Sequence, residues 1–133
     1  VVDYRFKKHA IDIAYKTDVE DLILSEIIHL VNTKAGILPG VFSSIDKIKS
    51  AGIPMAIASS SPMKLIEEVI NKLGIKTVLS CVFTAHDDAL GKPHPSVYIR
   101  TASRMGAHPE NCWVIEDSVN GMIAGKAAKM NVI

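Results

Sequence analysis

The residues best suited to chemistry in this chain are two adjacent carboxylates, Glu116 and Asp117. They end the apolar segment that begins at Val114, and a hydroxyl, Ser118, follows them. Magnesium prefers oxygen ligands and is commonly held by one or two carboxylates together with a substrate phosphate. The pair is therefore a candidate magnesium site. The alternative is a helix cap, in which Asp117 or Ser118 binds the free amides of the helix that follows.

A second candidate is the hydroxyl run Ser59-Ser60-Ser61, which follows the apolar residues Ile57 and Ala58. If this run lies between a strand and the start of a helix, free backbone amides and the positive end of the helix dipole attract an anion there. Ser59 and Ser60 are therefore candidate phosphate-binding residues. Simple capping of the following helix is the alternative, and the two roles are compatible.

The third candidate is Lys92, which stands in the sequence Gly91-Lys92-Pro93-His94-Pro95. The two prolines limit the freedom of the backbone and so hold the ammonium near one place. An ammonium held in this way can neutralise the oxygens of a phosphoryl group. A solvated lysine in a surface turn is the alternative.

Helical and extended segments alternate after residue 40, which predicts an α/β fold. Expected helices cover residues 41–51, 63–73, 96–105 and 119–130, and expected strands cover 55–58, 78–84, 112–115 and 131–133. Strands that are separated by helices pair in parallel in a doubly wound sheet, with helices on both faces and ligands at the carboxyl ends of the strands. The hydroxyl run and the acidic pair both follow such ends. We therefore expect Lys92 to lie close to Glu116 and Asp117.

The first part of the chain predicts a separate helical subdomain over residues 1–38, and residues 39–133 form the predicted α/β domain. Thr17-Asp18-Val19-Glu20 has the pattern of a capping box, and the apolar residues after it recur with a helical period up to Gly36. Residues 1–15 are expected to be helical as well, and residues 36–40 have the composition of a linker.

Composition excludes several classes of protein. The chain has 133 residues, of which 48% are hydrophobic and 22% charged, and a net charge of +1, so we expect a globular protein without nucleic acid as a partner. No apolar run approaches the roughly 20 residues that a membrane span needs, and we expect a cytoplasmic protein with no membrane partner. Its two cysteines lack the spacing of a zinc site. The sequence leaves the oligomeric state open, with a monomer as the expectation.

The order of the three candidate groups along the chain resembles that of the haloacid dehalogenase (HAD) superfamily of phosphatases and phosphomutases. Ser59 matches the second motif of that family, Lys92 its third, and Glu116 with Asp117 its fourth. Residues 116–124 and 126–130 are similar to the β-phosphoglucomutase-like branch, near hexitol and 2-deoxyglucose-6-phosphate phosphatases. The resemblance implies a HAD-like Rossmannoid parallel sheet with helices on both faces, and it makes residues 1–38 part of a helical cap.

The first motif of the family, Asp-x-Asp-Gly, has no match in this sequence. In the family its first aspartate forms an aspartyl-phosphate and its second acts as general acid and base. The nearby pair Asp87-Asp88 lacks both the glycine and a preceding apolar strand, so we assign no nucleophile. The resemblance therefore implies that the central first strand is missing and that the chain is an internal piece of a longer protein, inactive by itself.

The resemblance implies a magnesium-dependent phosphatase of small sugar phosphates, such as hexose, deoxyhexose or hexitol phosphates, in the full-length protein. It implies that Lys92 and Ser59 are catalytic, that Ser60 joins them in binding phosphate, and that Glu116 and Asp117 hold Mg²⁺. Asn120 would support the site. One alternative is a phosphomutase of the β-phosphoglucomutase type, and another is a catalytically silent binding module.

Overall fold

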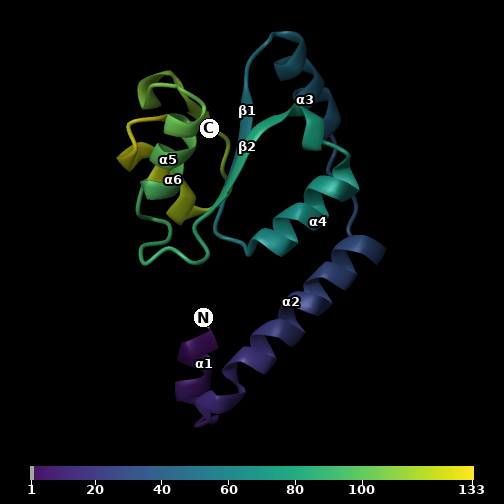
Figure 1. Ribbon diagram of the computed structural model, residues 1–133, viewed down its shortest axis with the longest axis vertical. Coiled ribbons are helices and arrows are strands. Elements are labelled where there is room, and N and C mark those ends of the chain that lie inside the picture. Colours follow the sequence, from purple (N-terminus) through teal and green to yellow (C-terminus); the bar gives the residue numbers. More distant parts are fainter. Residues whose placement is uncertain (1) are drawn as a thin grey trace. The chain divides into compact units, whose positions relative to one another are not determined.

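The computed structural model describes residues 2–133 and divides the chain into two compact units, Val1–Gly36 and Ile37–Ile133 (Figure 1). Val1, the first residue of the expected helical subdomain, lies outside the described residues. Within residues 2–133 the smaller unit carries only helices, and the four strands belong to the larger unit. The candidate site residues therefore all lie in the larger unit.

The smaller unit pairs two helices, α1 (Val2–Lys8) and α2 (Lys16–Thr33), through the short 3-10 helix η1 (Ile13–Tyr15). Phe6 of α1 is 5% exposed. Lys16 of α2 also forms an ion pair with Asp3 of α1 at 2.7 Å. The identification of this unit as a partial cap stays a prediction.

The predicted capping box at Thr17 is wrong, because α2 begins at Lys16 and Thr17 lies within the helix. The chain is already turned by η1 at this point, and the carboxylate of Asp12 caps η1 by accepting from the Ala14 amide at 2.9 Å. The helix expected over residues 1–15 is also interrupted, since Ala10 has a φ of 50° and so leaves the helical conformation.

The larger unit alternates helices and strands as the sequence predicts. Its elements are α3 (Val41–Ser50), β1 (Met55–Ser59), α4 (Met63–Leu73), η2 (Lys76–Val78), β2 (Leu79–Thr84), α5 (Ser96–Arg104), η3 (Pro109–Asn111), β3 (Trp113–Val114), α6 (Val119–Ala127) and β4 (Asn131–Val132). The largest difference is at α6, which ends at Ala127 instead of residue 130. Lys129 adopts a φ of 60°, which cannot continue a right-handed helix.

The strands form two parallel pairs. β1 pairs with β2, with Ala56 opposite Cys81, and β3 pairs with β4, with Val114 opposite Val132. The described strands show no pairing between the two pairs. The predicted parallel α/β fold is confirmed, and among the described residues its strands form two separate sheets, β1–β2 and β3–β4.

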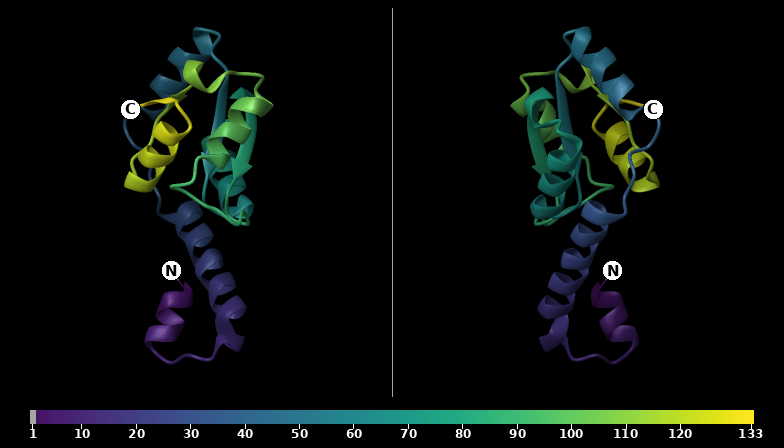
Figure 2. Two further views of the ribbon diagram at one scale, coloured as in Figure 1. Left: turned by 90° about the vertical axis from the view of Figure 1, so that its left-hand side faces the viewer. Right: turned by 90° about the vertical axis from the view of Figure 1, so that its right-hand side faces the viewer.

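Helices α5 and α6 join the two strand pairs through a common hydrophobic core. α5 packs on β1 and β2, α6 packs on β4, and the two helices contact each other (Figure 2). Val97 of α5, Ala124 of α6 and Val114 of β3 are all buried in this core. Gly125 lets α6 approach β4, because a Cβ atom there would lie 2.7 Å from Cγ2 of Val132. This packing brings the end of β3 close to α5.

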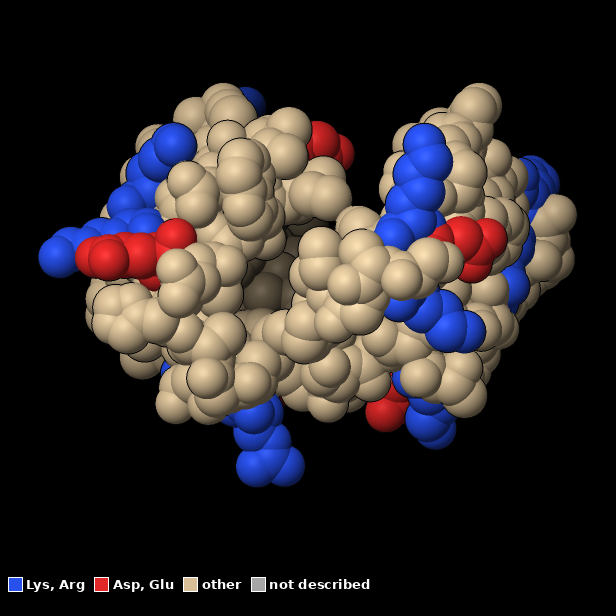
Figure 3. Space-filling view, turned by 90° about the horizontal axis from the view of Figure 1, so that it is seen from above, with Lys and Arg blue, Asp and Glu red and all other residues tan. Residues whose placement is uncertain are grey.

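Charged side chains do not form a single-sign field on the face shown in Figure 3. Lys and Arg side chains stand at separate places on this face, and acidic side chains lie beside several of them. This agrees with the net charge of +1. Among the described residues, no helix combines the length and the apolar character needed to cross a membrane.

Candidate active site

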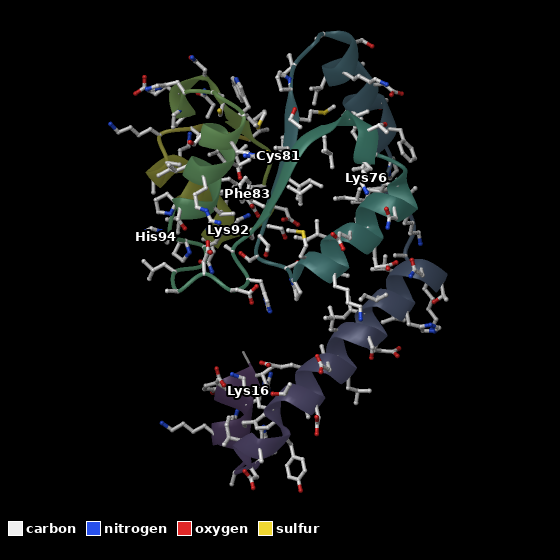
Figure 4. All side chains as sticks on the ribbon, viewed as in Figure 1. Lys16, Lys76, Cys81, Phe83, Lys92 and His94 are labelled. Atoms are coloured by element: carbon white, nitrogen blue, oxygen red, sulfur yellow. The ribbon has the colours of Figure 1, made fainter. Side chains whose placement is uncertain are left out.

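The centre of the site is an ion pair between Lys92 and Glu116. Lys92 comes from the loop between β2 and α5, and Glu116 follows β3 after Ile115. Nζ of Lys92 lies 2.6 Å from Oε2 of Glu116, and each side chain is 11% exposed. In Figure 4, Lys92 lies near one end of α5, whereas His94 lies farther out on the same loop. The structure therefore brings together two of the groups that the sequence singled out.

The carboxylate of Glu116 accepts four hydrogen bonds. Oε2 accepts from Lys92 and from the hydroxyl of Tyr98, each at 2.6 Å. Oε1 accepts from the amide of Ser118 at 3.1 Å and from its hydroxyl at 2.7 Å. Sequence reasoning missed Tyr98, because an aromatic residue on the buried face of a helix gives no signal of a polar role.

The four donors keep Glu116 ionised. Burial by itself raises the pKa of this carboxyl group, but the hydrogen bonds from Lys92, Tyr98 and Ser118 outweigh it and lower the pKa from 4.5 to about 2. Burial, followed by the hydrogen bond to Glu116, raises the pKa of Tyr98. Tyr98 therefore stays protonated and donates a hydrogen bond to the carboxylate.

The low pKa of Glu116 predicts an acid-sensitive contribution to stability. Because the pKa is lower in the folded state, the ionised group stabilises the fold fully above its usual pKa of 4.5, and this contribution disappears as the pH falls toward 2. We expect a loss on the order of 2–3 kcal/mol across this window. Urea unfolding of the wild type and of Glu116→Gln at several pH values measures it. The difference in unfolding free energy between the two proteins should shrink as the pH falls, and a constant difference would contradict the prediction.

Gly121 makes room for the Glu116 carboxylate against the first turn of α6. A Cβ atom at residue 121 would lie 1.9 Å from Cδ of Glu116 and 2.1 Å from its Oε2. Ser118 is the N-cap of α6 and accepts from the Gly121 amide at 3.0 Å, so the capping alternative is confirmed for Ser118. The same serine thus caps the helix and holds Glu116.

The hydroxyl run after β1 is held by its own backbone and by the end of β2. Oγ of Ser59 accepts from the Ser61 amide at 3.1 Å, and the hydroxyl of Thr84 donates to the Ser61 carbonyl at 2.6 Å. The N-cap of α4 is Pro62, with no side-chain cap, so the capping alternative for the serines is wrong. A hydroxyl that accepts still has its hydrogen to donate, and Ser59 keeps that capacity.

An open cavity of about 400 Å³ lies beside the ion pair. Its lining residues are Ser60, Lys92, Ser118, Val119 and Asn120. Three predicted site residues therefore share one cavity. Ser59, Glu116 and Asp117 are not among its lining residues. Sequence reasoning did not propose Val119 as part of the site.

The two acidic residues differ in their availability to a metal ion. Both oxygens of Glu116 are occupied by donors. Asp117 is exposed, and none of the interactions recorded for the described residues uses its side chain. Within the part of the chain that the structure describes, no three His, Cys, Asp or Glu side chains gather around a possible metal position. Of the acidic pair, Asp117 is therefore the carboxylate whose oxygens are free to bind a cation, and Mg²⁺ would also need oxygens from elsewhere.

The loop that carries Lys92 is tied to α5 by Asp88. Both oxygens of Asp88 accept from Nη1 of Arg100 at 2.8 Å, and the guanidinium of Arg100 lies 5.3 Å from the centre of the Phe83 ring. This geometry gives Asp88 a structural role. It agrees with the absence of the glycine and the preceding apolar strand that a nucleophile motif at Asp87-Asp88 would need.

Comparison with known proteins shows the family of this chain. A family model described as haloacid dehalogenase-like hydrolase matches residues 3–129. The chain belongs to this family. The resemblance inferred from Ser59, Lys92, Glu116 and Asp117 is therefore confirmed.

Members of the family that resemble this chain include phosphatases and a phosphomutase. Hexitol phosphatase B of Escherichia coli is 33% identical over 133 residues, which are all of this chain and 60% of the relative. A bifunctional riboflavin kinase/FMN phosphatase of Arabidopsis thaliana is 40% identical over 97 residues, covering 72% of this chain and 26% of the relative. The crystal structure of β-phosphoglucomutase from Clostridium difficile superposes with a TM-score of 0.84 at 27% identity, covering 99% of this chain and 59% of that protein.

Proposed function

We propose that the full-length haloacid dehalogenase-like protein is a magnesium-dependent phosphatase of small sugar phosphates. The observation that carries the proposal is the ammonium of Lys92 at the edge of a cavity that Ser60 and Asn120 also line. A volume of about 400 Å³ falls within the range typical of small-molecule sites. The similarity to hexitol phosphatase B favours a sugar or sugar-alcohol phosphate.

In this proposal the chain supplies charge and hydrogen bonds to a phosphoryl group. Phosphoryl transfer depends mainly on positioning and on charge stabilisation. Lys92 neutralises the phosphoryl oxygens, while the hydroxyls of Ser59 and Ser60 donate to them. Mg²⁺ would be held by Asp117, with Glu116 next to the metal shell, and it would neutralise charge on the phosphate. Asn120 would support the site from the first turn of α6, and a cytoplasmic location stays a prediction.

Turnover by the full-length product of the gene tests the proposal. Phosphate release from p-nitrophenyl phosphate, and then from a panel of hexose, deoxyhexose and hexitol phosphates, should require Mg²⁺ and should disappear with EDTA. The 133-residue chain serves as the comparison, and we expect it to be inactive because it lacks a candidate nucleophile. Turnover by the full-length protein that is unaffected by EDTA would contradict the magnesium assignment. Absence of turnover on every phosphate ester would favour a silent binding module.

A phosphomutase is the second candidate, because the β-phosphoglucomutase of Clostridium difficile matches nearly the whole chain. A mutase uses the same phosphoryl-binding groups and returns the phosphoryl group to a different hydroxyl. Incubation with β-glucose 1-phosphate separates the two functions. Formation of glucose 6-phosphate without release of inorganic phosphate would favour the mutase.

The Ser60→Ala variant tests the phosphate-binding role of the hydroxyl run. Ser60 is exposed and lines the cavity, so its loss should remove one hydrogen bond to a charged ligand without disturbing the fold. We expect turnover to fall about tenfold with p-nitrophenyl phosphate as substrate. Ser80→Ala, also at an exposed position but outside the cavity lining, is the matched control. Equal turnover in the Ser60 and Ser80 variants would contradict a phosphate-binding role for Ser60.

A further inference from the structure

Tyr98 contacts both members of the central ion pair. Its hydroxyl donates to Oε2 of Glu116 at 2.6 Å, and the same oxygen accepts from Lys92 at 2.6 Å. The ammonium of Lys92 also lies 4.7 Å from the centre of the Tyr98 ring. Tyr98 is only 6% exposed, so the packing around α5 fixes its ring. A single rigid side chain thus faces the carboxylate with its hydroxyl and the ammonium with its ring.

Without such a contact, the ion pair would not have one fixed geometry. A lysine side chain has a flexible stem and loses rotamer entropy when it is held in place. Ser118 holds only Oε1 of Glu116, so the carboxylate could pivot about that oxygen. The hydroxyl of Tyr98 fixes Oε2. The position of Oε2 in turn determines where the ammonium of Lys92 lies at the edge of the cavity.

We propose that Tyr98 is a positioning residue that holds the Lys92 ammonium at the cavity by fixing Oε2 of Glu116. Tyr98 is not among the lining residues of the cavity, so it acts through Lys92 and Glu116 and not on the ligand. The importance of this role for catalysis rests on the proposed function, in which Lys92 binds the phosphoryl group. The geometric part of the inference can be tested by itself.

The decisive comparison is between Tyr98→Phe and Thr101→Val in the full-length protein. Tyr98→Phe keeps the ring and removes only the hydroxyl, and the ammonium of Lys92 is still available as a donor, so the buried acceptor Oε2 of Glu116 is not left without any donor. Thr101→Val also removes a buried hydroxyl from α5, but that hydroxyl donates to the Val97 carbonyl within the helix. Both variants therefore lose a hydrogen bond of α5, and only one loses contact with the ion pair.

The ring current of Tyr98 reports the position of Lys92. In the wild type, the side-chain protons next to the Lys92 ammonium should resonate upfield of those of exposed lysines, because they lie close to the ring face. In Tyr98→Phe the ring is still present, yet we expect these protons to move toward the position of an exposed lysine. In Thr101→Val we expect them to stay at the wild-type position. An unchanged shift in Tyr98→Phe, or an equal loss in both variants, would overturn the inference.

Binding of inorganic phosphate separates this inference from the proposed function. Phosphate added to the wild-type full-length protein should shift the amide resonances of the cavity residues Ser60 and Asn120. The dissociation constant should rise about fivefold in Tyr98→Phe, as expected for the loss of one hydrogen bond, and stay unchanged in Thr101→Val. If phosphate caused no amide shift in the wild-type protein, the result would count against the proposed function. The shift of Lys92 would still decide the role of Tyr98.

Discussion

The Lys92→Ala variant of the full-length protein is expected to lose about 10²–10³-fold in phosphatase turnover. The ammonium of Lys92 is the only Lys or Arg group among the cavity-lining residues that the structure describes, so its removal leaves the phosphoryl oxygens without that compensation. Loss of charge stabilisation acts mainly on the transition state, and kcat should fall more than the affinity for substrate. Steady-state kinetics with p-nitrophenyl phosphate measure both quantities.

Two further variants separate catalysis from stability at Lys92. Lys92→Ala also leaves the buried carboxylate of Glu116 without its cationic partner, which destabilises a fold by roughly 3–5 kcal/mol when one member of a buried pair is removed. The double variant Lys92→Ala/Glu116→Gln removes that unpaired charge, so it should regain stability but not turnover. Lys76→Ala, at an exposed position, is the control for the loss of a lysine. Wild-type turnover in Lys92→Ala would reject the assignment.

The Gly121→Ala variant is expected to damage the site without touching any group that binds phosphate. The added methyl group would occupy the place of the Glu116 carboxyl group, with a separation of 1.9 Å from Cδ. Glu116 must then leave its position, and its hydrogen bonds with Lys92 and Tyr98 are lost with it. We expect a destabilisation of about 1–3 kcal/mol, as for other overpacked sites, and a loss of turnover of about a hundredfold.

Gly91→Ala provides the matched control for this substitution. A Cβ atom at residue 91 would meet only the Ala85 carbonyl oxygen, at 4.0 Å, which is an ordinary contact. Urea unfolding and turnover should therefore be close to wild type in this variant. If Gly121→Ala were as stable and as active as Gly91→Ala, the carboxylate of Glu116 would not lie against α6 as described.

Local patterns in the sequence were sufficient for most of the fold. The helix predicted at residues 63–73 is α4 (Met63–Leu73), and it ends at Gly74, which adopts a left-handed conformation with a φ of 65°. Such helix boundaries depend on residues that are neighbours along the chain, so the sequence indicates them directly. The prediction failed at Thr17, because the preceding 3-10 turn had already started the helix there. A capping pattern does not reveal whether the chain before it is extended.

The candidate site was predicted only in part. The order of Ser59, Lys92 and the acidic pair along the chain identified the family, since each group follows or precedes an element whose type the sequence shows. The sequence did not show that Glu116 and Asp117 differ in their hydrogen bonding and exposure. In the structure Glu116 is occupied by donors from three residues, whereas Asp117 is exposed.

The sequence by itself determined the family, the alternation of helices and parallel strands, and the types of group that we propose to bind phosphate. Only the tertiary structure revealed the positioning role of Tyr98 and the need for glycine at residue 121. The physical reason is that the contact between Tyr98 and Glu116 joins residues that are 18 positions apart. Gly121 is close to Glu116 along the chain, but the Glu116 carboxylate lies against it only because Lys92 and Tyr98, from a distant segment, hold the carboxylate there. The distance in space between Tyr98 and Glu116 is set by the packing of α5 against the strands and α6, which leaves no periodic signal in the sequence.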